Sequence, residues 1–331
     1  MPRTQRAIYD ERYTGTGYDQ RSAVPVLTAE RSALRRAVDR AISTTAGDRS
    51  PVTLFDFGFG TGRVTNEFLV SFPERYGSLG RDLRVIAYDV SAVGLRKAEE
   101  ELKWRHAFEA PDEIKWDDEA SAGYVAGSLV RDVRGIRLSV VFVHGNEAES
   151  PAAIGRLVRA ATRGPALITT SWYSCLGHIP GRQRRAQFFR MLDRVTDPRG
   201  ELLIAPSVSG DLVEAQAEWA ERLRRGDIGD HPIEVPGDVM YETELHGLNF
   251  WHVFGTDLDE LIRRGLGPHQ RAWIEALRMP GPEFGSAVDE QVNYRQTQLF
   301  NLARQRRRWR HSDYRRVHTA VAVRSGSPRA R

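Results

Sequence analysis

The chain has 331 residues, of which 40% are hydrophobic, and it contains one cysteine. This length predicts one large decorated domain or two small ones with a substantial core. A single cysteine excludes an internal disulfide framework and a clustered-cysteine zinc site, and we expect no metal. No apolar run approaches the roughly 18 residues of a membrane-spanning helix, and no secretory signal is recognised at the N-terminus. We therefore expect a cytoplasmic protein that does not bind membranes.

The positive charge of the chain is concentrated near its C-terminus. The formal net charge is +4 and the sequence pI is about 9.3. Residues 304–316 carry seven arginines and a single acid, Asp313. Such a stretch can bind nucleic acid or anionic substrates, or it can be the solvated face of a helix.

Strands and helices alternate along the first two thirds of the chain. The first fifty residues are expected to be helical, with a helix over 28–42. Strands are expected at 52–57, 83–91, 137–147, 165–172 and 201–208. Helices are expected at 63–72, 92–108, 152–161 and 184–195. Residues 110–135 are interpreted as an insertion and 197–200 as a turn. Because the strands are apolar throughout, they predict a parallel sheet covered on both faces, with ligands at the carboxyl ends of its strands.

The remainder of the chain is less regular. A helix is expected over 211–225, a loop over 226–238 and a sixth strand at 271–277. A final strand is expected within 315–324. We expect an N-terminal cap or lid, 1–50, followed by one domain, 51–331. The insertions of that domain are expected at about 110–135, 211–249 and 280–310.

The first strand is followed by the glycine-rich stretch Asp56-Phe-Gly-Phe-Gly-Thr-Gly-Arg63. Gly58, Gly60 and Gly62 allow positive φ angles and the close approach of a ligand to the backbone. A helix that begins after Gly62 offers free N–H groups to a carboxylate or phosphate. The spacing matches neither the dinucleotide fingerprint nor the phosphate loop, so a structural turn is the alternative.

The next two strand ends also carry polar residues. Asp89 can accept hydrogen bonds from both hydroxyls of a ribose, or it can cap the following helix. Val90 follows it in the same loop. Asn146 or Glu147 can accept from an exocyclic amine of adenine, and Asn146 can donate to a ring nitrogen. An ordinary polar turn is the alternative for this loop.

The fourth strand end, "TTSWYSCLGHIPGRQ", is the richest in chemical groups. Ser171 and Trp172 end the strand, and Trp172 and Tyr173 can form the wall of a site for an apolar or cationic substrate. His178 can act as a base or be a loop histidine bonded to backbone. Cys175 is interpreted as a small buried residue rather than a nucleophile.

In their order, these stretches resemble class I S-adenosylmethionine-dependent methyltransferases. The resemblance rests on "LFDFGFGTGR", "VIAYDVS", "VVFVHGNEAES", "ALITTSWYSCLGHIP" and "FFRMLDRVTDPRGELLIAPSV", which together span about Val52 to Val208. It implies a Rossmann-like α/β fold with seven strands, mostly parallel, the last antiparallel. It also implies S-adenosyl-L-methionine as donor and S-adenosyl-L-homocysteine as product. The donor-binding residues are then expected to be Tyr13, Asp56, Gly58, Gly60, Gly62, Arg63, Asp89, Val90, Asn146, Glu147, Ser171 and Trp172.

In methyl transfer the protein mainly positions donor and acceptor, and a base is needed only where the acceptor must lose a proton. Candidate bases are His178, His246, His252 and Glu242. Candidate substrate-binding residues are Trp172, Tyr173, His178, Tyr241 and Trp251. The aromatic and polar mixture around Trp251 suits a small-molecule pocket, and core packing is the alternative.

Three functions remain open at this point. The first is methylation of a small-molecule nitrogen, oxygen or carbon, as in specialised metabolism. The second is methylation of RNA or another nucleic acid through residues 304–316, although no N/D-P-P-Y/F motif is present. The third is a non-catalytic donor-binding protein on the same fold. A homodimer is one option for the oligomeric state.

Overall fold

The computed structural model describes most of the first two thirds of the chain and selected segments after it. The described residues are 5–14, 24–117, 120–146, 148–172, 175–206, 238–243, 247–252, 254, 261, 271–277 and 319–325. The first fifty residues contain two helices, α1 (Gln5–Thr14) and α2 (Val24–Thr44). None of the helices in these ranges has both the length and the apolar character that crossing a membrane requires.

A mixed sheet forms the centre of the fold, with strands in the order β3-β4-β2-β1-β5-β6-β10-β9. Its strands are β1 (Val52–Phe57), β2 (Leu83–Asp89), β3 (Tyr124–Val133), β4 (Ile136–His144), β5 (Ala166–Ser171), β6 (Thr196–Ile204), β9 (Arg271–Leu277) and β10 (Thr319–Ser325). The central strands β4, β2, β1, β5 and β6 are parallel. Strand β10 is antiparallel to both β6 and β9, which confirms the expected antiparallel final strand.

The expected number of seven strands is wrong, because this sheet has eight. The additional strand, β3, lies within residues 110–135, for which the sequence predicts an insertion. It pairs antiparallel with β4, and the turn between them contains Arg134 and Gly135 at positive φ. The outer edge of β3 is partly covered, since Glu109 exchanges two backbone hydrogen bonds with Val130. The sequence did not indicate a strand here because its faces alternate between partly exposed and buried residues.

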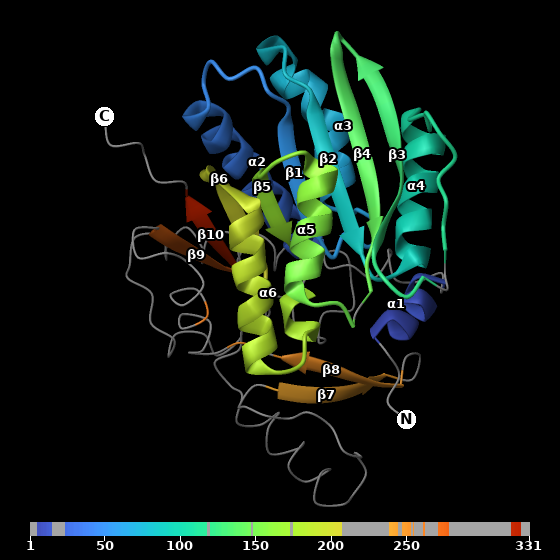
Figure 1. The fold of residues 1–331 in the computed structure, drawn as a ribbon. Coiled ribbons are helices and arrows are strands. Elements are labelled where there is room, and N and C mark those ends of the chain that lie inside the picture. The colour runs from blue at the N-terminus through green and yellow to red at the C-terminus, as the bar shows by residue number, and fades with distance from the viewer. Residues whose placement is uncertain are drawn as a thin grey trace, which may run out of the picture.

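Helices cover both faces of the sheet (Figure 1). One face buries α2, α3 (Thr65–Tyr76) and α4 (Ala92–His106) against residues such as Leu54, Val85 and Ile168. The opposite face buries α5 (Pro151–Thr162) and α6 (Arg182–Val195) against Phe55 and Ile86. Neighbouring residues of β1 thus point to opposite faces, which explains why apolar residues of this strand, such as Leu54 and Phe55, are buried on both faces.

The predicted turn at 197–200 is instead part of β6. Ala166 pairs with Thr196 and Ile168 pairs with Glu201, so β6 contains several more residues than β5 over the same span. These residues form a bulge, in which Asp197 Oδ1 accepts a hydrogen bond of 2.8 Å from Arg199 N. The sequence thus correctly predicts a local turn at these residues, but the turn is a bulge inside β6 rather than a connection that precedes the strand.

Two elements lie at the edge of the sheet where β1, β2 and β4 end (Figure 1). One is α1, which contacts α4. The other is a hairpin formed by β7 (Asp238–Thr243) and β8 (Gly247–His252), with β8 in contact with the short 3-10 helix η2 (Cys175–His178). A second 3-10 helix, η1 (Gly77–Leu79), follows α3. The edge at which the parallel strands end is thus covered by an N-terminal helix and by a hairpin from the later part of the chain.

The core around α3 allows a direct test of this packing. Leu69 of α3 is fully buried, whereas Leu79 is 43% exposed. We expect Leu69→Ala to lower the free energy of unfolding by about 2–5 kcal/mol, because it leaves a cavity. Leu79→Ala should change it by less than about 0.5 kcal/mol. Urea denaturation followed by circular dichroism measures both, and equal losses would contradict the described packing.

Candidate functional site

The loop after β1 is held in a conformation that requires glycine. Gly58, Gly60 and Gly62 have φ angles of +82°, +56° and +76°. The loop is fixed to the neighbouring strand, because the amides of Gly58 and Phe59 both donate to the carbonyl of Tyr88 at 2.9 Å. Its backbone therefore lies directly beside the end of β2.

Asp89 links this loop to the start of α4. Its Oδ2 accepts a hydrogen bond of 2.7 Å from Gly60 N, and its Oδ1 accepts one of 2.8 Å from Ser91 N. Ser91 in turn caps α4 by accepting from Gly94 N at 3.1 Å. The carboxyl group is 6% exposed, and burial raises its pKa to about 6 against the effect of its backbone hydrogen bonds. The charge of Asp10 also raises this pKa.

Asp56 lies deeper, within β1 itself. It is 1% exposed, and its two oxygens accept hydrogen bonds from Thr65 Oγ1 at 2.5 Å and from Thr170 Oγ1 at 2.8 Å. Burial raises the pKa of Asp56 to about 6, and the two hydroxyl hydrogen bonds lower it only in part. This carboxyl group therefore ties the start of α3 and strand β5 to β1.

Helix α1 packs onto the glycine-rich loop through Tyr13, which is 6% exposed. A Cβ atom added to either Gly60 or Gly94 would collide with the ring or hydroxyl of Tyr13. Both glycines are therefore needed for this close approach. Asp10, one turn earlier, accepts a hydrogen bond of 2.6 Å from Ser91 Oγ. Tyr13 thus lies beside the predicted donor-binding loop, although it comes from a different part of the chain.

The same helix also reaches the loop after β5. The ring of Tyr9 meets the ring of His178 edge-on, with their centroids 5.5 Å apart. The Sγ atom of Cys175 lies 3.7 Å from the carbonyl oxygen of Gly58, and a Cβ at Gly58 would collide with it. Residues from α1, η2 and the first loop are therefore gathered at one place on the sheet edge.

Two polar side chains at the end of β5 are buried without hydrogen bonds. Ser171 is 2% exposed and Trp172 is 4% exposed. Within the described part of the chain, neither Ser171 Oγ nor Trp172 Nε1 has a hydrogen-bond partner. Buried polar atoms are nearly always paired, so these two indicate a site for a polar ligand or water.

The loop after β4 forms hydrogen bonds of a different kind from those of the loop after β2. Asn146 Nδ2 donates to Ser121 O at 3.0 Å, and its Oδ1 accepts from Ala148 N at 2.9 Å. Its side chain therefore stabilises a local turn.

The carbonyl of Val90 lies 3.1 Å from His144 Nε2, which holds the loop after β2 against β4. The carbonyl of Arg63 accepts from Arg31 Nη2 at 2.8 Å.

The other predicted site residues are not all described. His252 is fully buried in β8, with its ring edge-on to Phe254 at 4.5 Å between centroids. The following fall outside the described residues or side chains: Tyr173, Glu147, His246, Tyr241, Glu242, Trp251, residues 304–316 and the insertion at 280–310. Their roles remain predictions.

Sequence reasoning missed Glu30 and Asp10. Glu30 of α2 is fully buried, and its charge contributes to the raised pKa of the Cys175 thiol. The signal was present in the sequence, since Glu30 precedes Leu34 and Val38 on the apolar stripe of its helix. A carboxylate on such a stripe is rarely buried without a functional or structural reason.

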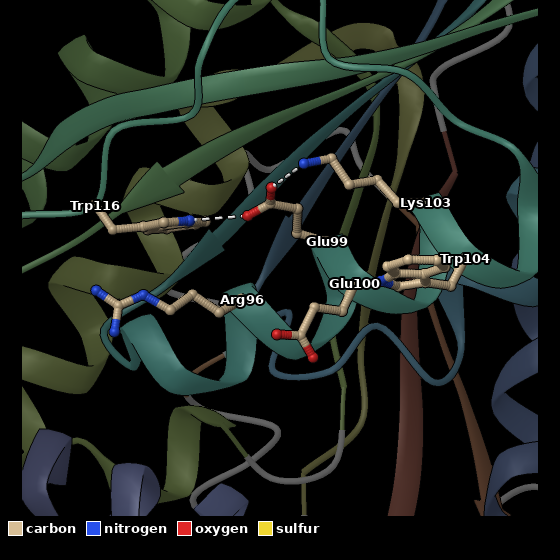
Figure 2. A pocket seen from close by; sticks show the side chains of 6 residues that line it. All are labelled: Arg96, Glu99, Glu100, Lys103, Trp104 and Trp116. Atoms are coloured by element: carbon tan, nitrogen blue, oxygen red, sulfur yellow. Dashed lines mark hydrogen bonds and ion pairs between the residues drawn. The ribbon is translucent and has the colours of Figure 1, made fainter.

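A hollow lies on the outer face of α4, away from this site (Figure 2). It is lined by Arg96, Glu99, Glu100, Lys103, Trp104 and Trp116. Glu99 accepts from Trp116 Nε1 at 2.8 Å and pairs with Lys103 at 2.7 Å, as the dashed lines in Figure 2 show. Its polar groups are therefore largely engaged with one another, and it contains none of the predicted site residues.

Comparisons with known proteins give a likeness in fold only. No protein-family model matches the chain, and no curated protein matches it. Many solved structures that resemble it are S-adenosylmethionine-dependent methyltransferases. One from Methanosarcina mazei is 12% identical, with 86% of this chain and 96% of that chain covered and a TM-score of 0.43.

Two further structures contain S-adenosylhomocysteine. Phosphoethanolamine N-methyltransferase 2 from Haemonchus contortus is 13% identical, with 98% of this chain and 61% of that chain covered and a TM-score of 0.44. The 1,6-didemethyltoxoflavin-N1-methyltransferase from Burkholderia thailandensis is also 13% identical, with 99% and 92% covered and a TM-score of 0.44. Similarity at this level does not indicate the reaction or substrate of the present chain.

The Asp56 network predicts a pH-dependent effect of removing one hydroxyl. We expect Thr170→Val to lower the free energy of unfolding by about 1–3 kcal/mol at pH 8, where the carboxylate is charged. The loss should be smaller at pH 5, because Asp56 with a pKa of about 6 is then mostly protonated. Urea denaturation at both pH values measures the difference. Thr53→Val on β1, the strand of Asp56, is the control, and an equal pH effect there would contradict this role.

Proposed function

We propose that this chain is an S-adenosylmethionine-dependent methyltransferase that acts on a small-molecule acceptor. One observation carries the proposal: the buried Asp89 carboxylate ends β2 and accepts from the amide of Gly60 in the glycine-rich loop. It thus places a hydrogen-bond acceptor beside backbone that a ligand can approach closely. In open α/β sheets this edge of the parallel strands is where ligands bind.

The residues present fit such a donor. Asp89 retains acceptor capacity beyond its two backbone hydrogen bonds, which suits the two hydroxyls of a ribose. Gly58, Gly60 and Gly62, all at positive φ, have no side chains of their own, so other groups can lie close to the loop backbone. The unpaired polar atoms of Ser171 and Trp172 support a polar ligand at the neighbouring strand end.

S-adenosylmethionine supplies a methyl group on a positively charged sulfur, which makes the leaving group reactive without further activation. The chain therefore has to bind and orient the donor and the acceptor, and to exclude water from them. We assign orientation to Asp89 and the glycine-rich loop, and exclusion of water to α1, which covers them with Tyr13. His178, held against Tyr9, is our candidate for contact with the acceptor.

The role of Asp89 predicts both a mutational effect and a pH effect on binding. We expect Asp89→Asn to weaken binding of S-adenosylhomocysteine roughly ten- to hundredfold, because hydrogen bonds to a charged group are lost. In the wild type the dissociation constant should be constant above pH 7. It should rise by up to about tenfold per pH unit below pH 6, as Asp89 with a pKa of about 6 becomes protonated. Isothermal titration calorimetry from pH 5 to 8 measures both effects.

Asp132→Asn provides the matched control, since Asp132 is an exposed aspartate on β3 paired with Arg137. Its affinity for S-adenosylhomocysteine should equal that of the wild type. Undiminished affinity in Asp89→Asn would overturn the ribose assignment, and the absence of wild-type binding would overturn the proposed function.

The covering helix predicts a separate effect. We expect Tyr13→Ala to weaken S-adenosylhomocysteine binding by about tenfold, because burial of an aromatic side chain over the loop is lost. Tyr13→Phe keeps the ring and should retain most of the affinity. Tighter binding by Tyr13→Ala would show instead that Tyr13 competes with the donor, and calorimetry distinguishes the two results.

A further inference from the structure

The glycine-rich loop is anchored at both of its ends, and by different elements. Its first half is bonded to β2, where the carbonyl of Tyr88 and the carboxyl group of Asp89 accept from loop amides. Its second half turns into α3 at Gly62, whose carbonyl accepts from Asn66 N at 2.7 Å. The two halves of the loop can therefore be disturbed separately.

Helix α2 holds the second half of the loop through Arg31. Its Nη2 donates to the carbonyl of Arg63 at 2.8 Å, and its Nη1 lies 2.5 Å from Glu67 Oε2. Arg63 directly follows Gly62, and Glu67 lies in the first turn of α3. One guanidinium group thus bridges the end of the loop and the start of the helix, which its planar set of N–H groups makes possible.

Arg35, one turn further along α2, offers a direct comparison with Arg31. Its Nη2 lies 2.9 Å from Glu67 Oε1. The two arginine side chains are similarly exposed, at 31% for Arg31 and 39% for Arg35. Ion pairs at such positions contribute little to stability. The bond to the Arg63 carbonyl is therefore the contact that distinguishes Arg31 from its neighbour.

A buried acceptor atom at the same end of the loop indicates a ligand. Asn66 is 4% exposed, and its Nδ2 donates to the carbonyl of Thr61 at 3.1 Å. Its Oδ1 accepts no hydrogen bond from the residues that the structure describes. A Cβ atom on Gly62 would lie 2.5 Å from this oxygen, so the oxygen lies against the loop. Buried amide oxygens are nearly always paired, so an N–H group of a ligand or a water molecule is expected here.

We propose that Arg31 is a positioning residue, which holds the end of the glycine-rich loop in the conformation that receives the amino-acid part of the donor. The inference rests on the proposed function and adds α2 to the elements that form the donor site. Asp89, at the first half of the loop, is already assigned to the ribose. The ammonium group of the amino-acid part is then the N–H donor that Asn66 Oδ1 accepts.

Arg31 acts through the backbone and does not touch the donor. The peptide group whose carbonyl it binds is one residue from Gly62, which has a φ angle of +76°. Without the guanidinium group, this part of the loop can change conformation at low cost, because glycine restricts the backbone least. Asn66 would move with it, since its amide and its side chain both bond to the loop. The first half would remain fixed to β2.

Two ligands with the same nucleoside separate the two halves of the site. S-adenosylhomocysteine has the amino-acid part, whereas 5′-methylthioadenosine lacks it. Arg31→Met removes the guanidinium group and keeps an apolar side chain at a partly exposed position. We expect it to weaken binding of S-adenosylhomocysteine about tenfold and of 5′-methylthioadenosine less than about twofold, as measured by calorimetry. A merely structural role would weaken both ligands equally.

Arg35→Met is the matched control, because it removes an ion pair with the same Glu67. It should change neither affinity by more than about twofold. Arg31→Gln, a milder variant that keeps a neutral donor, should shift the ratio of the two affinities in the same direction as Arg31→Met by a smaller factor. Both ligands are measured on one preparation, so loss of folded protein does not mimic a change in this ratio.

Three results would overturn the inference. They are an unchanged affinity of Arg31→Met for S-adenosylhomocysteine, an equal loss for both ligands, and an equal effect in Arg35→Met. If the wild-type protein binds neither ligand, the proposed function itself fails.

Discussion

The hydrogen bond from Gly60 N to Asp89 is the contact on which the arrangement of the sheet edge depends. It fixes the loop after β1 to the end of β2, while the same carboxyl group orders the first residues of α4 through Ser91 N. Ser91 then holds α1 by donating to Asp10. The cost of burying Asp89 is offset by these bonds, so loss of one would loosen the loop and both helices together.

This dependence explains why glycines occupy the positions against which Tyr13 and Cys175 pack. Tyr13 can lie against the loop only because Gly60 and Gly94 lack side chains, and Cys175 can lie against it only because Gly58 does. Gly58 and Gly60 therefore serve both backbone conformation and close packing, whereas Gly94 in α4 serves close packing. The glycine-rich loop is consequently a junction of α1, α4 and η2 as well as a candidate binding surface.

The sequence predicted the central strands because their signals are local. β1, β2 and β5 are short apolar runs, and each ends close to a polar or glycine-rich loop. It did not predict the edge strand β3, whose partly exposed faces lack an apolar run. Glu30 and Asp10 were not predicted for a different reason: the role of each depends on interactions with residues far away in the sequence. Glu30 acts on Cys175, and Asp10 bonds Ser91.

The buried carboxylates also link the protonation of the protein to the binding of a cationic ligand. Asp56 and Asp89 each have a pKa of about 6 in the fold, against 3.8 for an ordinary aspartate. The folded state therefore binds more protons than the unfolded state between these values, and this contribution to stability is lost as pH rises through that window. A positively charged ligand favours the ionised carboxylates, so its binding lowers both pKa values and releases protons near pH 6. The free-energy cost of burying two carboxylates is thus lowered by a cationic ligand, which is the kind of ligand that the site is proposed to bind.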